Sequence, residues 1–137
     1  MIITRFTVAY WCVLIVALLP LVCAGMAKYG LFRKSRQDGG YDNHNPRAWL
    51  SSQSGWRARA NAAQANSFEA LPFFIGAVII AHQLGAAQAA LDILAFCFVF
   101  LRMLYIMMYV ADAPTARSGV WALALVVNVA ILFLGYR

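Results

Sequence analysis

Two sets of polar residues occur at helical spacing within largely apolar stretches of the sequence. Asn66 and Glu69 are three residues apart, whereas Arg102, Tyr105 and Tyr109 are separated by three and four. Residues at these spacings share a helix face, so each set would present its polar groups together. An ionisable residue inside a membrane span is a functional hypothesis by default, and we expect Glu69 and Arg102 to pair directly at a similar depth.

Two structural interpretations compete with a functional one. The pair of Glu69 and Arg102 could fix helix packing, and the two tyrosines could belong to the interfacial aromatic belt. Neither interpretation accounts for Arg117, which reaches the same membrane level on the last apolar stretch. Phenols beside guanidinium groups suit an anionic small molecule, so the sequence favours a ligand site.

Other chemistry finds less support in the sequence. Cys12, Cys23 and Cys97 all lie in apolar runs, where buried thiols that behave as small hydrophobes are expected. His44 and His82 are predicted on opposite sides of the membrane without ligand partners at suitable spacing, so no metal site is predicted. The sequence also shows no phosphate-binding glycine loop, nucleophile elbow or Cys-x-x-Cys motif.

The elements that must position these residues are membrane helices. Hydrophobic residues make up 64% of the 137 residues, charged residues only 12%, and the mean hydropathy is +0.71. About 20 apolar residues cross a bilayer core. We therefore predict an all-α, integral membrane four-helix bundle in one domain, residues 1–137. Its spans are expected at about 6–27, 57–83, 86–110 and 116–136.

The polar connection 28–56 predicts the topology. Seven Lys and Arg residues lie between Lys28 and Arg59, against two Asp residues. Positive residues gather in cytoplasmic loops, so we expect this loop in the cytoplasm and both termini on the opposite side. The net charge of +6 then reflects topology, and no nucleic-acid partner is predicted. Short loops without a targeting extension favour a bacterial inner membrane.

The sequence resembles the MAPEG proteins, membrane-associated proteins in eicosanoid and glutathione metabolism, over nearly its whole length. Span two of that family carries Arg-x-x-x-x-(His/Gln)-x-Asn-x-x-Glu and then an apolar stretch with proline. The matching residues here are Arg59, Gln64, Asn66, Glu69 and Pro72. Span three is similar to the family's Arg-x-x-Tyr-x-x-x-Tyr through Arg102, Tyr105 and Tyr109, and the next link ends in Arg117.

The resemblance implies a homotrimer that is surrounded by membrane lipids and holds glutathione between neighbouring subunits. Arg117 would stabilise the glutathione thiolate as the catalytic residue, because a guanidinium lowers the pKa of a nearby thiol. The thiolate would attack or reduce a lipophilic small molecule that arrives from the bilayer. The residues implied to hold glutathione are Gln64, Asn66, Glu69, Arg102, Tyr105 and Tyr109. The implied activity is that of a transferase or peroxidase.

The sequence also departs from the family pattern. Ala62 and Ala65 stand where some members carry basic residues, and Arg117 follows Tyr109 by eight residues, about one residue off the spacing of the closest eicosanoid-synthesising members. Losing a partner for a glutathione carboxylate would weaken binding by roughly ten- to a hundredfold. Arg57, Arg59 or the basic loop could compensate for the missing charges.

These departures keep an alternative function open. A MAPEG-like membrane scaffold or lipid-binding subunit without transferase activity would also need the four spans, but not the thiolate chemistry. A small transporter or channel subunit is less well supported, because no span shows the internal repeat or broken helix that transport proteins display.

Overall fold

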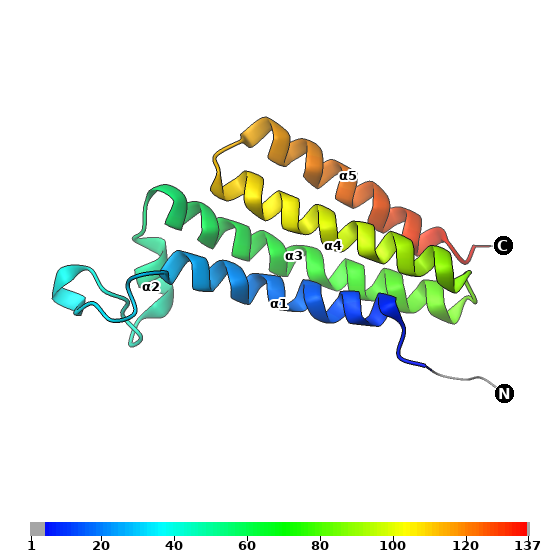
Figure 1. Cartoon of the computed structure of the whole chain (residues 1–137), viewed down its shortest axis with the longest axis horizontal. Coiled ribbons are helices and arrows are strands. Elements are labelled where there is room, and N and C mark those ends of the chain that lie inside the picture. The colour runs from blue at the N-terminus through cyan, green and yellow to red at the C-terminus, as the bar shows by residue number, and fades with distance from the viewer. Residues whose placement is uncertain (1–4, 137) are drawn as a thin grey trace.

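The computed structural model describes residues 5–136, and four long helices account for most of them (Figure 1). These helices are α1 (Val8–Lys28), α3 (Gly55–Gln83), α4 (Gln88–Val110) and α5 (Pro114–Phe133). Each is long and apolar enough to cross a membrane, which confirms the all-α prediction with four spans. Their ends differ from the predicted ranges by three residues or fewer.

The long helices form a bundle in which α3 and α4 lie in the middle and α1 and α5 on the outside (Figure 1). The described ends of the chain lie together at one end of the bundle. The connection between α1 and α3 projects from the opposite end. The polar half of α3, the C-terminal part of α4 and the start of α5 all lie toward that connection.

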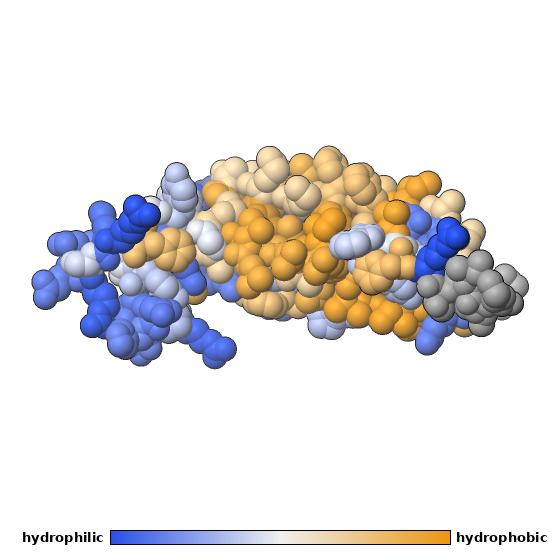
Figure 2. All heavy atoms as spheres, turned by 60° about the horizontal axis from the view of Figure 1, so that its bottom comes forward, coloured by the Kyte–Doolittle hydropathy of each residue, from blue (hydrophilic) through white to orange (hydrophobic). Residues whose placement is uncertain are grey.

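The surface of the bundle is unusually apolar. Large side chains such as Leu21, Phe96 and Val126 are 60–64% exposed, and Figure 2 shows a hydrophobic band over the middle of the face it displays, beside a strongly polar end at the left. Apolar patches of this extent mark a membrane or interaction surface. Together with the four apolar helices, the band identifies an integral membrane protein.

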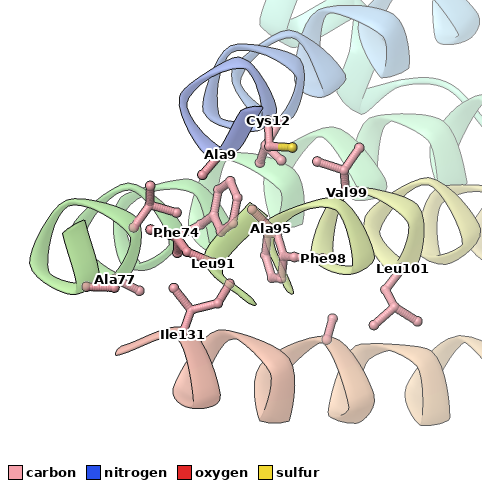
Figure 3. Packing of buried hydrophobic residues seen from close by; sticks show 14 residues of the cluster. Ala9, Cys12, Phe74, Ala77, Leu91, Ala95, Phe98, Val99, Leu101 and Ile131 are labelled. Atoms are coloured by element: carbon pink, nitrogen blue, oxygen red, sulfur yellow. The ribbon is translucent and has the colours of Figure 1, made fainter. Parts of the chain in front are cut away.

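The core contains many small side chains around one aromatic pair (Figure 3). The rings of Phe74 on α3 and Phe98 on α4 stack with centroids 4.3 Å apart and planes at 14°, and both are almost fully buried. Ala9 and Ala95 are fully buried nearby. Small residues let membrane helices approach closely, so the bundle packs tightly where its spans meet.

Two arginines at the start of α3 bind the ends of other helices. Arg57 donates from Nη1 to the carbonyl oxygens of Ala27 (2.9 Å) and Tyr29 (2.7 Å), where α1 ends. Arg59 donates from Nε to the carbonyl of Val110 (3.1 Å), the last residue of α4. The last carbonyls of a helix lack partners within it, and a cation there also interacts favourably with the negative end of the helix dipole. Both arginines are thus engaged in joining helix ends.

A second polar assembly holds the opposite end of the bundle. Asp92 on α4 accepts through Oδ1 from the backbone N–H of Ala9 (2.9 Å) and from Nε2 of Gln88 (2.7 Å). A nitrogen of His82 lies 3.3 Å from Oε1 of Gln88. The first N–H groups of a helix need an acceptor, and Asp92 supplies one to α1 across the bundle. We call His82, Gln88 and Asp92 the terminal cluster.

The connection between α1 and α3 contains two short helices that the sequence analysis did not predict, η1 (Arg36–Asp38) and α2 (Pro46–Ser51). Between them, Asp42 accepts from the backbone N–H of His44 (3.0 Å) and forms an ion pair with Arg36 (3.3 Å). These contacts, the His44 hydrogen bond above all, lower the pKa of Asp42. The connection is therefore locally ordered.

Candidate functional site

A tight turn between α4 and α5 brings Arg117 onto Tyr109. Asp112 adopts a left-handed conformation with φ of 59°, and the N–H of Ala113 donates to the carbonyl of Met108 (2.9 Å). Bonds of this kind close a helix C-terminus and reverse the chain. As a result, the guanidinium of Arg117 lies 4.4 Å from the centre of the Tyr109 ring.

Arg102 and Asn66 form the buried part of the site. Nη2 of Arg102 donates to Oδ1 of Asn66 at 2.8 Å, and Nδ2 of Asn66 lies 3.4 Å from Oε2 of Glu69. Arg102 is only 2% exposed, whereas Glu69 is exposed. The predicted direct pair of Glu69 and Arg102 is therefore wrong, because the amide of Asn66 bridges the two charges. The only ion pair among residues 5–136 is the one between Arg36 and Asp42.

Cations and phenol rings alternate from this buried part to the surface. The guanidinium of Arg102 lies 4.3 Å from the Tyr105 ring centre. The Tyr105 and Tyr109 rings meet edge to face at 5.7 Å, and Arg117 covers Tyr109. A cation over the face of an aromatic ring is attracted to that ring electrostatically. The set that we call the groove cluster consists of Asn66, Glu69, Arg102, Tyr105, Tyr109 and Arg117.

The groove cluster lines two adjoining spaces between α3, α4 and α5. The polar groove, about 290 Å³, is lined by Asn66, Tyr105, Tyr109, Arg117, Ser118 and Trp121. The apolar cavity, about 210 Å³, has walls that include Phe73, Phe98 and Leu125, together with Glu69 and Arg102. Asn66 and Trp121 line both spaces. A ligand with a polar and an apolar part could therefore occupy one continuous surface of α3, α4 and α5.

Gln64 is the one predicted site residue that lies away from the groove cluster. It is two residues from Asn66, which corresponds to about 200° around a helix. It lines a different cavity, about 490 Å³, together with Arg47, Ser51 and Asn61. Within residues 5–136, its Oε1 is buried without a hydrogen-bond partner. Ala62 and Ala65, the positions that lack the basic residues of some family members, line the same cavity.

Among the residues of the apolar cavity that the sequence did not indicate, two can form hydrogen bonds, Trp121 and Asn128. Asn128 is 3% exposed and lines the cavity, and its Oδ1 has no hydrogen-bond partner among the described residues. It is the one amide in the apolar stretch 119–134, and polar residues in a span are functional candidates, so this signal could have found it. Trp121 carries no such signal, because tryptophan is common in membrane helices near the interface.

The chemistry of the groove cluster suits a zwitterionic ligand. Arg117 is only half-buried at the polar groove and can meet an anion, and charge-assisted hydrogen bonds to guanidinium are strong. Glu69 is exposed at the adjoining cavity and can meet a cation. Arg102 holds the amide of Asn66 so that its Nδ2 faces Glu69, which fixes the orientation of both groups.

Comparison with known proteins identifies the family. No curated protein and no solved structure matches this chain significantly. The model of the MAPEG family, in contrast, matches residues 8–136, which include all four spans and every residue of the groove cluster. The chain therefore belongs to the MAPEG family.

Proposed function

We propose that this protein is a glutathione-dependent transferase or peroxidase that acts on lipophilic electrophiles within the membrane. The observation that carries the proposal is the adjacency of the polar groove and the apolar cavity, which share Asn66 and Trp121. The polar groove offers the guanidinium of Arg117 and two phenols for a tripeptide, and Glu69 lies at the edge of the adjoining cavity. The apolar walls of that cavity offer a site for an acceptor that partitions into the bilayer.

The residues present fit much of glutathione, which carries two carboxylates, one ammonium group and a thiol. Glu69 would meet the ammonium group, and Tyr105 and Tyr109 would donate to carbonyl or carboxylate oxygens. Arg117 would stand beside the thiol, where its fixed positive charge favours the thiolate. Arg102 would act mainly by holding Asn66, since its guanidinium is almost fully buried.

The reaction that follows is a nucleophilic substitution or addition. The thiol loses its proton to water, and the thiolate sulfur forms a bond to the electrophilic carbon of the acceptor. With an aryl halide, the carbon–halogen bond breaks and halide leaves. The rate depends on the fraction of bound glutathione that is present as thiolate at the working pH. Arg117 contributes by holding the sulfur in its charged, reactive form.

A homotrimer would complete the site from a second face of α3. Gln64 and Arg47 line a cavity of their own, and Gln64 has an unpartnered Oε1. In a trimer, this face of one subunit would meet the groove cluster of its neighbour, and Arg47 would bind the glutathione carboxylate that the missing basic residues at positions 62 and 65 leave unpaired. We further propose that the polar connection 28–56 lies on the cytoplasmic side of a bacterial inner membrane, the side from which glutathione would enter.

The test of the activity is conjugation of glutathione to an aryl halide by the detergent-solubilised protein. We expect Arg117→Ala to lower turnover by roughly 10²-fold, the loss typical of removing one preorganised electrostatic group. Arg117→Lys should retain part of the activity, because it keeps the charge. Arg36→Ala is the matched control, since Arg36 lies on the connection and pairs with Asp42.

Equal turnover in the wild type and Arg117→Ala would contradict the role of Arg117. Absence of turnover in the wild type would favour the alternative, a MAPEG scaffold or lipid-binding subunit without transferase activity.

Mixed oligomers test whether the site is shared between subunits. We expect Gln64→Ala and Arg117→Ala to be defective alone, and mixtures of the two proteins, assembled together, to regain activity. A site that takes Gln64 from one subunit and Arg117 from its neighbour would then be intact at some interfaces. If both residues act within one subunit, every site in the mixture carries a defect and activity stays low.

A further inference from the structure

Asn128 lies in an environment where an amide without a partner is unfavourable. It is 3% exposed within α5 and lines the apolar cavity whose walls include Phe73, Phe98 and Leu125. Its Oδ1 has no hydrogen-bond partner in the described part of the chain. Buried polar groups are normally hydrogen-bonded, and the need is greater where lipid replaces water. Packing of α5 alone does not explain this residue.

We propose that Asn128 determines the specificity of the apolar cavity by hydrogen-bonding a hydroxyl group of the lipophilic substrate. An amide donates and accepts, and a hydroxyl does the same. The terminal torsion of asparagine is soft, so the amide can turn either atom toward the cavity. This inference rests on the proposed function, and it narrows the acceptor to an amphiphile that carries a hydroxyl within its apolar tail.

The spacing along α5 places the hydroxyl away from the reacting atom. Asn128 follows Arg117 by eleven residues, which corresponds to about 16 Å along the helix. Arg117 lines the polar groove and Asn128 the apolar cavity, and Trp121 lies between them in the sequence and lines both. The acceptor would therefore present its electrophilic end near Arg117 and extend its tail past Trp121 toward Asn128.

The position of Arg102 agrees with this arrangement. It lines the same cavity, and its Nε is also buried without a partner. The cavity thus has a charged donor on α4 and an amide on α5 whose hydrogen-bonding capacity is not used within residues 5–136. A hydroxyl near Asn128 would use one of them, whereas a purely hydrocarbon tail would use neither.

The experiment measures the selectivity of the wild type and of Asn128→Leu for hydroxylated acceptors. The acceptors are alkyl enones that carry a hydroxyl at successive tail carbons, each compared with the deoxy parent. In the wild type, we expect one hydroxyl position to raise kcat/KM by roughly tenfold over the parent, the size of one neutral hydrogen bond. In Asn128→Leu, the ratio should fall to about one at every hydroxyl position.

Equal ratios in the two proteins, or a wild type that prefers no hydroxyl position, would overturn the proposal. The second outcome needs no variant, so the test stands if Asn128→Leu fails to fold. Absence of all turnover in the wild type would instead count against the proposed function. In that event, quenching of Trp121 fluorescence, with Trp121→Phe as reference, measures binding of the same amphiphiles. A preference for one hydroxyl position that Asn128→Leu abolishes would support the role of Asn128, and equal binding of all amphiphiles would overturn it.

Discussion

The terminal cluster and the groove cluster are both polar assemblies within the same bundle, but they use their hydrogen-bonding capacity differently. In the terminal cluster, Asp92 accepts from a backbone N–H of α1 and from Gln88. In the groove cluster, Arg102 keeps an unpartnered Nε, and the adjoining Asn128 an unpartnered Oδ1. None of the four buried atoms without partners in residues 5–136 belongs to the terminal cluster.

This difference separates a structural role from a binding role. A polar group whose bonds are all made within the protein stabilises the fold. A polar group that lines a cavity and keeps unused capacity is available to a ligand. Mutations in the terminal cluster should therefore change stability and leave binding intact, whereas mutations at the exposed part of the groove cluster should do the reverse.

The largest effect is expected for Asp92→Ala. It removes the acceptor of two hydrogen bonds, one of them to the N-terminus of α1, and should lower the free energy of unfolding by about 3 kcal/mol. Denaturant unfolding in detergent micelles measures this. Asp38→Ala, on the exposed connection, is the control and should have little effect. A change below about 0.5 kcal/mol in Asp92→Ala would refute the structural role of the terminal cluster.

Glu69→Gln tests the binding role of the exposed part of the groove cluster. Glu69 is exposed and makes one long contact with Asn66, so the free energy of unfolding should stay within about 0.5 kcal/mol. Loss of its charge should weaken glutathione binding by about 1.5 kcal/mol, or roughly tenfold. Isothermal titration of the wild type and of Glu69→Gln with glutathione measures this difference in affinity. An unchanged affinity would remove Glu69 from the binding site.

Arg59→Ala tests whether this residue of the family motif stabilises the fold or binds the ligand. Arg59 matches that motif, yet its Nε binds the last carbonyl of α4. Its loss should cost about 1 kcal/mol of unfolding free energy without changing the KM for glutathione. Arg57→Ala should cost more, because Arg57 binds two carbonyls. A raised KM in Arg59→Ala with unchanged stability would show that Arg59 contacts the ligand instead.

The smallest effect concerns the connection. Hydrogen bonding from His44 and the charge of Arg36 lower the pKa of Asp42 below its ordinary value of 3.8. The folded connection is therefore favoured above pH 3.8, and this contribution is lost as the pH falls through the lowered pKa. Pepsin cleavage within 36–44 should accelerate over that acidic range in the wild type. In Asp42→Asn, we expect faster cleavage whose pH dependence is that of pepsin alone, and identical profiles for the two proteins would contradict the prediction.

Sequence patterns predicted the spans well because hydropathy and length dominate the placement of membrane helices. They did not predict η1 and α2, because these short helices depend on local contacts such as those of Asp42. They placed Glu69 and Arg102 at a similar depth in the membrane. Depth does not fix the rotation of each helix about its axis, however, and the side chain of Asn66 lies between the two charges. Likewise, the motif grouped Gln64 with Asn66, although a spacing of two puts them on different helix faces.

Stabilisation of the thiolate by the groove cluster is tested most directly by the pKa of the glutathione thiol when bound to the protein. Ultraviolet absorbance of the thiolate is followed against pH for the wild type and for Arg117→Ala at saturating glutathione. If the groove cluster stabilises the thiolate, the wild type should titrate well below the ordinary thiol value of about 8.5, and Arg117→Ala should return toward it. A wild-type titration that matches free glutathione would show that the groove cluster does not stabilise the thiolate.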